Sequence, residues 1–313
     1  MKIIFMGTPQ IAVPALSTLI ASEHELAAVV TKADKVSGRG LNVSFSPVKE
    51  LAIKNNIEVI QPERISDEAV MDRLEAIGAD VMAVAAFAQK IPDRVLEMSR
   101  FGCINLHPSL LPKYRGSDPL RAPILNGDKV SGVTIMKLVR EWDAGDILMQ
   151  KEIVLDKKET AASLELKAAE LGAEMMLETI EGLEKGIIRP VPQDHEKASY
   201  YKQITKEAGI MDFSNSAEYI ERQIRAMNPW PSAMTTLDGR CFKIWDADVL
   251  DKDEFNSEDY MPGQIVYADK HRFIIKTADG LLQPNEVQLE GKRRMSSEEF
   301  LRGKKLEAGV CFG

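Results

Sequence analysis

The chain has 313 residues, of which 44% are hydrophobic and 28% charged, and its formal net charge is −8. This length exceeds the usual size of one domain, so we expect two, and the acidic balance excludes a general nucleic-acid-binding protein while allowing a local basic surface. Three widely spaced cysteines fit neither a disulfide framework nor a zinc site, and no apolar run is long enough to span a bilayer. We therefore expect a cytoplasmic protein without a signal peptide or a membrane partner.

Strands and helices alternate over the N-terminal part of the sequence. The apolar run Met1–Met6 predicts a buried parallel strand that ends at Gly7, and a glycine turn and a helix follow it. We then expect, in chain order, a strand at Leu26–Thr31, a helix at Pro47–Asn55, an extended segment at Glu58–Ile60, a helix at Ser66–Ile77 capped by Ser66, and strands at Ala79–Phe87 and Gly102–His107. This order predicts a doubly wound, Rossmann-like α/β domain with a mainly parallel sheet.

The remaining elements predict a second, smaller domain. Strand-like segments at Ser131–Leu138 and Gly145–Val154 predict a β-hairpin excursion, and Thr160–Lys185 predicts a long amphipathic helix. Hydrophobic periodicity then fades, and after a helix at Ser216–Arg225 come short strands with turn signals, which predict a small, OB-like β-barrel. We expect an N-terminal domain over residues 1–189, a linker over 190–208 and a C-terminal barrel over 209–313.

The turn after the first strand does not favour a dinucleotide-binding enzyme. That class requires G-x-G-x-x-G, whereas this chain has Gly7-Thr8-Pro9, in which Pro9 removes an amide donor that a phosphate would need. A tight strand-to-helix turn explains the glycine.

Asn105 and His107 are the first candidates for catalysis. Side chains alternate along a strand, so both face the same side at its carboxyl end, the edge at which open α/β sheets bind ligands. A lone histidine is more often a satisfied structural residue, but an amide and an imidazole together form a donor pair that could hold a carbonyl oxygen as it becomes an oxyanion. A proline-rich turn follows, and we expect Lys113, Tyr114 and Arg115 beyond it to reach the rim of the site.

The loop "EWDAGD" at residues 141–146 carries a further candidate, Asp143. Clustered acids in a loop usually form a solvated turn, and we assign that role to Asp146. If the loop folds back over the Asn105 edge, however, Asp143 would fix the tautomer of His107 and could accept a proton from an attacking amine.

Two basic segments could contact a partner. The loop Lys32–Lys49 contains Lys35 and Arg39, and it is either a solvated loop or a partner-binding loop. Lys292, Arg293 and Arg294 could lie on an RNA backbone, although acids slightly outnumber bases in that part of the chain.

Taken together, these motifs resemble the methionyl-tRNA formyltransferase family of folate-dependent formyltransferases, over essentially the whole chain. The stretch "GCINLHPSLLPKYRG" resembles the family signature, "DAGDIL" resembles the loop with its catalytic aspartate, and "NPWPSAMTTLDGR" and "EGKRRMSSEEFLRG" resemble its tRNA-specific C-terminal branch. Departures include Ala88 where glycine is frequent and Leu41-Asn42 where basic residues are common.

The resemblance implies an enzyme that transfers a formyl group from 10-formyltetrahydrofolate, without a metal, to the α-amine of methionyl initiator tRNA for translation initiation. It further implies a monomer with the catalytic residues Asn105, His107 and Asp143, the folate contacts Ser109, Leu110, Leu111 and Pro112, and the tRNA contacts Lys35, Arg39, Lys292, Arg293 and Arg294. A sugar-nucleotide or glycinamide ribonucleotide formyltransferase, a formyltetrahydrofolate hydrolase and a catalytically silent RNA-binding protein remain the alternatives. The C-terminal motifs favour tRNA over the first two, and the Asn105/His107 pair speaks against the silent protein.

Overall fold

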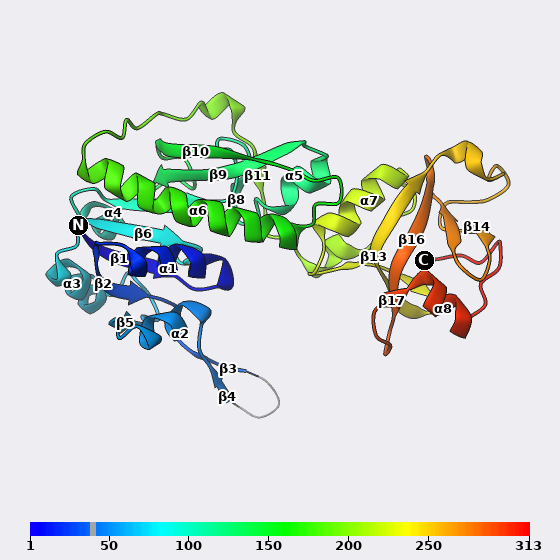
Figure 1. Ribbon diagram of the computed structural model, residues 1–313, viewed down its shortest axis with the longest axis horizontal. Coiled ribbons are helices and arrows are strands. Elements are labelled where there is room, and N and C mark those ends of the chain that lie inside the picture. The colour runs from blue at the N-terminus through cyan, green and yellow to red at the C-terminus, as the bar shows by residue number, and fades with distance from the viewer. Residues whose placement is uncertain (38–41) are drawn as a thin grey trace. The chain divides into compact units, whose positions relative to one another are not determined.

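The computed structural model describes residues 1–37 and 42–313, which form two compact units (Figure 1). The first unit comprises Met1–Pro119, Val130–Val154 and Glu165–Lys202, and the second comprises Leu120–Lys129, Leu155–Leu164 and Gln203–Gly313. The chain thus crosses between the units more often than the sequence indicated. The segment predicted as a linker is divided at Lys202, because its first part packs within the first unit.

The first unit is built on a seven-stranded sheet with the strand order β10-β9-β7-β6-β1-β2-β5. The neighbours from β7 to β5 are parallel, and β9 and β10 are antiparallel additions at one edge. The strands are β1 (Lys2–Gly7), β2 (Glu25–Val30), β5 (Val59–Ile60), β6 (Val81–Ala85), β7 (Cys103–His107), β9 (Val130–Lys137) and β10 (Ile147–Val154). The predicted mainly parallel, doubly wound sheet and its hairpin excursion are therefore confirmed.

Helices cover both faces of this sheet. They are α1 (Val13–Ala21), α2 (Pro47–Lys54), α3 (Glu68–Ile77), α4 (Asp93–Glu97) and α6 (Ala161–Glu184). The sequence predicted all of them except the single-turn helix α4, which is too short to show periodicity. The predicted cap of α3 is wrong, because the helix begins at Glu68 and Asp67, not Ser66, takes the N-cap position.

Two small features of the first unit were not predicted. The loop Lys32–Lys49 contains a hairpin of β3 (Lys35–Ser37) and β4 (Asn42–Ser44). Farther along the chain, β8 (Arg115–Gly116) pairs in parallel with β11 (Tyr200–Tyr201). The second pairing ties the end of the predicted linker to the signature segment.

Packing across the sheet decides which way the side chains of β7 point. A Cβ on Gly172 of α6 would lie 2.4 Å from Cδ1 of Leu106, so the missing side chain leaves room for this leucine. On the opposite face the Cys103 thiol donates to the carbonyl of Val95 in α4. Because strand side chains alternate, Asn105 and His107 point to the α4 face, away from the long helix α6 visible in Figure 1.

The second unit is an antiparallel sheet with helices at its side. Its strands follow the order β12-β13-β16-β15-β14, with β17 paired to β16, and between the residues described at its two ends, β12 and β14, no ladder closes the sheet. The predicted small β domain is thus present, and closure into an OB-like barrel is not confirmed. Its elements are α5 (Arg121–Asn126), α7 (Ala217–Ala226), β12 (Ala233–Leu237), β13 (Arg240–Leu250), β14 (Ile265–Ala268), β15 (Phe273–Lys276), β16 (Leu281–Leu289), β17 (Met295–Ser296) and α8 (Ser297–Gly303).

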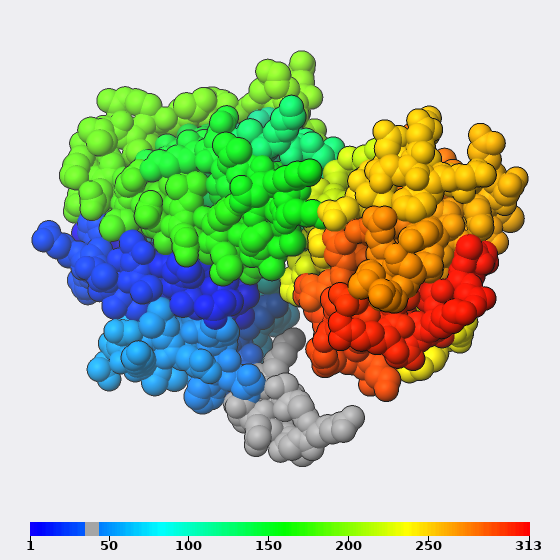
Figure 2. Space-filling view, turned by 45° about the vertical axis from the view of Figure 1, so that its right-hand side comes forward, coloured from blue at the N-terminus to red at the C-terminus, as the bar shows by residue number. Residues whose placement is uncertain are grey.

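The core of this second unit is aromatic. The ring of Phe242 lies 5.3 Å from that of Phe300 and 5.1 Å from that of Phe312, centroid to centroid, in tilted or edge-on arrangements. The strands and the C-terminal residues that enclose this core are drawn from yellow to red in Figure 2.

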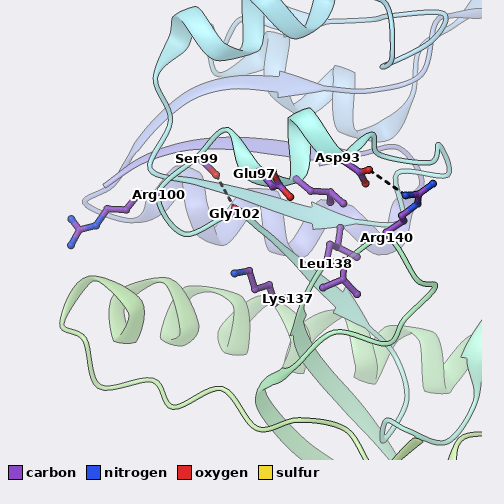
Figure 3. A pocket seen from close by; sticks show the side chains of 10 residues that line it. Asp93, Glu97, Ser99, Arg100, Gly102, Lys137, Leu138 and Arg140 are labelled. Carbon is purple, nitrogen blue, oxygen red and sulfur yellow. Dashed lines mark hydrogen bonds and ion pairs between the residues drawn. The ribbon is translucent and has the colours of Figure 1, made fainter.

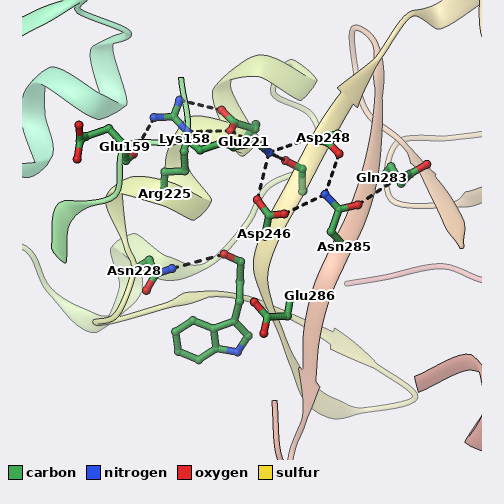
Figure 4. Close-up of polar contacts among 12 residues, drawn as sticks. Lys158, Glu159, Glu221, Arg225, Asn228, Asp246, Asp248, Gln283, Asn285 and Glu286 are labelled. Atoms are coloured by element: carbon green, nitrogen blue, oxygen red, sulfur yellow. Dashed lines mark hydrogen bonds and ion pairs between the residues drawn. The ribbon is translucent and has the colours of Figure 1, made fainter. Parts of the chain in front are cut away.

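Within the second unit, a charged cluster holds the segment before α6 against strand β13 (Figure 4). The Lys158 ammonium donates to Asp246 at 3.1 Å and lies 2.8 Å from Asp248, and the Asn285 amide bridges both carboxylates. Burial alone would lower the pKa of Lys158, but the hydrogen bonds to Asp248 and Asp246 outweigh it, so the pKa of Lys158 is raised. The hydrogen bond from Lys158 in turn lowers the pKa of Asp248.

No helix in the described ranges is both long and apolar enough to cross a membrane.

Candidate active site

The carboxyl end of β7 presents Asn105 and His107 beside the point at which the sheet reverses its winding. From β1 the chain proceeds outward to β2 and β5, whereas β6 and β7 lie on the other side of β1, so the carboxyl ends of β1, β6 and β7 border the crevice that ligands use in such sheets. Asn105 is half-buried, and no hydrogen bond joins its amide to another described residue. The Asn105 amide can therefore donate hydrogen bonds to a ligand at this edge and accept them from it.

His107 is almost completely buried, at 4% exposed, and an oxygen faces each of its ring nitrogens. Its Nε2 lies 3.0 Å from the carbonyl oxygen of Tyr114, and its Nδ1 lies 3.8 Å from Oδ1 of Asp143. A neutral imidazole has one N–H: with hydrogen on Nε2 the ring donates to the Tyr114 carbonyl and leaves the Nδ1 lone pair facing the carboxylate, whereas with hydrogen on Nδ1 that N–H points at Asp143. Two acceptors thus flank the ring, and while it is neutral it can donate to only one of them.

Asp143 reaches this position because its loop folds back over β7, as the sequence left open. The backbone N–H of Leu138, just after β9, donates to the Cys103 carbonyl, and the N–H of Gly116 donates to Oδ2 of Asp143 at 2.8 Å. Asp143 is 9% exposed and has φ = +51°, an uncommon backbone conformation for a residue with a side chain. Strain of this kind collects at functional sites.

The turn that follows His107 is held by its own hydrogen bonds. The Ser109 hydroxyl donates to the carbonyl of Lys113, Thr134 donates to the Ser109 carbonyl, and the Leu111 N–H donates to the Thr134 hydroxyl. Of the four residues predicted to bind folate, Ser109 and Leu111 are buried within the turn, while Leu110 and Pro112 are half-buried. The side chains of Ser109 and Leu111 therefore shape the turn.

The expectation for Arg115 at the rim is wrong. Its side chain is only 2% exposed, and its guanidinium donates to Oε1 of Gln193 and to the hydroxyl of Tyr200. The cause lies in the β8–β11 pairing, which turns the arginine inward under the residues predicted as a linker. The sequence contained no periodic signal for that contact.

A cavity of about 500 Å³ opens along α4 in the first unit (Figure 3). Asp93 and Arg140 face each other in it at 3.9 Å. None of the predicted catalytic or folate-binding residues lines it. Its lining consists of Asp93, Leu96, Glu97, Ser99, Arg100, Gly102, Lys137, Leu138, Val139 and Arg140.

Cys103 precedes the site on the same strand, but its thiol is not a nucleophile. It is fully buried, and burial raises its pKa to about 12, so the thiolate is scarce near neutrality. The thiol packs between the sheet and α4.

The basic residues predicted to contact a nucleic acid lie in different parts of the chain, and one of them is outside the described residues. Arg39 lies outside the described residues, and Lys35 begins the β3 strand. Lys292, Arg293 and Arg294 lie in the exposed connection between β16 and β17, where Arg293 pairs with Glu299 and Arg294 with Glu286. Exposed ion pairs of this kind are weak, so these cations can exchange their partners for phosphates.

Comparison with known proteins agrees with this geometry. Residues 1–180 match the family model described as formyl transferase, and residues 203–305 match that of the formyl transferase C-terminal domain. The chain belongs to the formyl transferase family. Its curated relatives include the methionyl-tRNA formyltransferases of Lachnospira eligens, 49% identical, and of Clostridioides difficile, 42% identical, each matched over 100% of both chains. These relatives place the chain in the methionyl-tRNA branch of the family, and the resemblance seen in the sequence is confirmed.

Solved structures show the same fold at lower identity. WlaRD, a sugar 3N-formyl transferase crystallised in the presence of dTDP and 5-N-formyl-THF, has a TM-score of 0.68 at 23% identity, over 94% of this chain and 99% of that one. HypX from Aquifex aeolicus in complex with tetrahydrofolic acid has a TM-score of 0.64 at 19% identity, over 98% of this chain and 50% of that one. These two likenesses establish the fold.

Proposed function

We propose that Asn105, His107 and Asp143 form the catalytic centre with which this enzyme transfers the formyl group of 10-formyltetrahydrofolate to the α-amine of methionyl initiator tRNA. The observation that carries the proposal is the convergence of the three side chains. An unengaged amide and a buried imidazole lie on one face of β7 at its carboxyl end, and a carboxylate from the loop after β9 lies 3.8 Å from that imidazole. The formylated product serves translation initiation.

The reaction adds the amine to the formyl carbon and then expels the folate nitrogen. The neutral α-amine, whose reference pKa is about 8, attacks the formyl carbon, and the carbonyl electron pair moves to the formyl oxygen. Asp143 accepts the proton that the attacking nitrogen loses. The electron pair on the oxyanion then re-forms the carbonyl, the bond between the formyl carbon and N10 breaks, and N10 takes the proton held by Asp143, so the carboxylate is regenerated and the charge balances.

Asn105 is the donor that is ready for the oxyanion. Its side chain bonds to no described residue, so it can donate to the formyl oxygen without breaking a protein contact. His107 can donate from Nε2 only when the formyl oxygen takes the place of the Tyr114 carbonyl, which lies 3.0 Å from that nitrogen. Removal of one oxyanion donor typically costs about 3–4 kcal/mol of activation free energy.

For the folate, the supporting residues are those of the turn after β7. Leu110 and Pro112 remain half-buried and can contact a flat heterocycle, while Ser109 and Leu111 keep the turn in shape. The turn is also tied to β10, because the Gln150 amide donates to the Leu111 carbonyl and to Thr134. A rigid turn binds such a ring at a low entropic cost.

For the tRNA, we propose phosphate contacts by Lys35, Arg39, Lys292, Arg293 and Arg294. In the second unit, the Arg294 guanidinium lies 4.8 Å from the ring of Trp245, and the Lys243 ammonium lies 5.6 Å from it. Basic groups next to an aromatic ring suit a nucleic-acid backbone and its bases. The enzyme acts as a monomer, which sedimentation at several concentrations tests.

The function is tested by offering several acceptors to the purified protein together with 10-formyltetrahydrofolate. We expect formylation of methionyl initiator tRNA, with little on a charged elongator tRNA and none on an amino sugar nucleotide. Formylation of the sugar nucleotide but not of the initiator would overturn the substrate. The catalytic centre is tested separately with Asp143→Asn, whose turnover at the level of the unaltered enzyme would remove Asp143 from the mechanism.

A further inference from the structure

Arg115 is a buried cation whose hydrogen-bond partners among the described residues are uncharged. Its side chain is 2% exposed, and within the described part of the chain no carboxylate lies within 4 Å of its guanidinium. The partners are neutral: Nε and Nη2 donate to Oε1 of Gln193 at 3.2 and 2.7 Å, Nη2 lies 3.1 Å from Nδ1 of His195, and Nη1 donates to the Tyr200 hydroxyl. A buried charge is costly, so it persists only when its hydrogen bonds are satisfied.

Gln193 connects this cation to the loop that carries Asp143. Its amide nitrogen donates to the carbonyl of Asp143 at 2.8 Å and to that of Gly145 at 2.7 Å, while its oxygen accepts from Arg115. All four hydrogen-bonding positions of the amide are therefore occupied, and the side chain is 5% exposed.

The chemistry of its neighbours fixes the orientation of this amide. An arginine can only donate, and a backbone carbonyl can only accept, so the Gln193 oxygen must face Arg115 and its nitrogen must face the loop. The buried cation thus prevents the amide from rotating and keeps both N–H groups on the Asp143 loop.

We propose that Gln193 is a positioning residue for formyl transfer and that Arg115 fixes its orientation; this inference rests on the proposed role of Asp143. The backbone of Asp143 has φ = +51°, and Gln193 holds that residue's own carbonyl. At the other end, the Asp143 carboxylate accepts from the N–H of Gly116, the residue after Arg115. Gln193 and Gly116 together aim Oδ1 at the His107 ring.

The sharpest substitution is Gln193→Glu, which separates the two contacts of the residue. A carboxylate still accepts from Arg115 and neutralises it, but it presents oxygen, not N–H, to the carbonyls of Asp143 and Gly145. The loop then loses both donors and is repelled. We expect the variant to fold and to keep its KM values within about threefold, while kcat falls about 10- to 100-fold, as a displacement near 1 Å at a reacting group does. Gln193→Asn, whose amide is one methylene too short to span both contacts, provides a second variant with the same expected loss.

A matched control lies in the second unit. Gln223 is 7% exposed, and its amide nitrogen likewise donates to two backbone carbonyls, those of Ala208 and Ile210. Gln223→Glu should lower the thermal midpoint without lowering kcat per folded molecule. An equal fall in kcat per folded molecule for Gln223→Glu and Gln193→Glu would show a general structural effect and overturn the inference.

A double-mutant cycle with Asp143→Asn decides whether Gln193 acts through Asp143. If it does, adding Gln193→Glu or Gln193→Asn to Asp143→Asn lowers kcat by less than threefold further. Fully additive losses, or unchanged kcat in both single Gln193 variants, would refute the positioning role. Wild-type turnover in Asp143→Asn alone refutes the proposed catalytic centre instead, so the two failures are distinguishable.

Discussion

Gly145→Ala should disable the enzyme without touching a reacting group. A Cβ at this position would lie 1.8 Å from the carbonyl oxygen of Lys137, and contacts of a Cβ below about 3 Å are essentially never seen. The carbonyl belongs to β9, which is paired on both sides with β7 and β10, so the loop must move by more than about 1 Å. Asp143 lies two residues earlier in that loop.

A misplacement of about 1 Å at a catalytic group costs roughly 100-fold in rate, or about 2.7 kcal/mol of activation free energy. We therefore expect kcat for formylation of methionyl initiator tRNA to fall about 100-fold in Gly145→Ala, with both substrates saturating. The assay measures the amount of formylated tRNA at one time point for a series of enzyme concentrations. Circular dichroism measures the folded fraction of each enzyme.

Gly303→Ala provides the control, because nothing lies within 4 Å of a Cβ at that position, at the end of α8. This variant should retain wild-type kcat. A folded Gly145→Ala enzyme with kcat within threefold of wild type would mean that the loop can shift without moving Asp143, and it would refute the argument.

Other expected outcomes follow from single contacts. Asn105→Ala should lower kcat by about 100- to 1,000-fold while folate binding, measured by fluorescence quenching, stays within a few fold; retained turnover would exclude an oxyanion role. Lys158→Met should destabilise the second unit by about 1 kcal/mol in thermal melts, because the Lys158 charge is only partly buried. The pKa of Lys158 is raised and that of Asp248 is lowered, so the stability difference between the unaltered protein and Lys158→Met should be largest between roughly pH 5 and 10. This stability difference should shrink as the pH falls through the aspartate pKa or rises through the lysine pKa. A stability difference that does not change with pH would show that only packing was lost. Replacing Arg293 and Arg294 together by alanine should weaken tRNA binding and reduce the salt slope of log K by about 1 to 2, and an unchanged slope would remove both from the phosphate contacts.

Local patterns determined the elements that lead to the site. The apolar run of β1 and the alternation along β7 depend only on neighbouring residues, so the sheet class and the common face of Asn105 and His107 followed from the sequence. The signature after β7 identified the family because its spacing of amide, imidazole and prolines is specific. Such patterns do not predict which segments that are remote in the sequence lie close together in space.

Tertiary structure alone decided how remote segments complete the site. Asp143 reaches His107 because its loop folds back over β7, and Gln193, in a stretch whose composition predicted a linker, holds that loop from a position 50 residues farther along the chain. Arg115 looked like a surface cation by its sequence neighbours and is buried by the pairing of β8 with β11. The roles of Arg115 and Gln193 produce no periodic pattern in the sequence, because their partners are brought close by the path of the chain and not by local spacing.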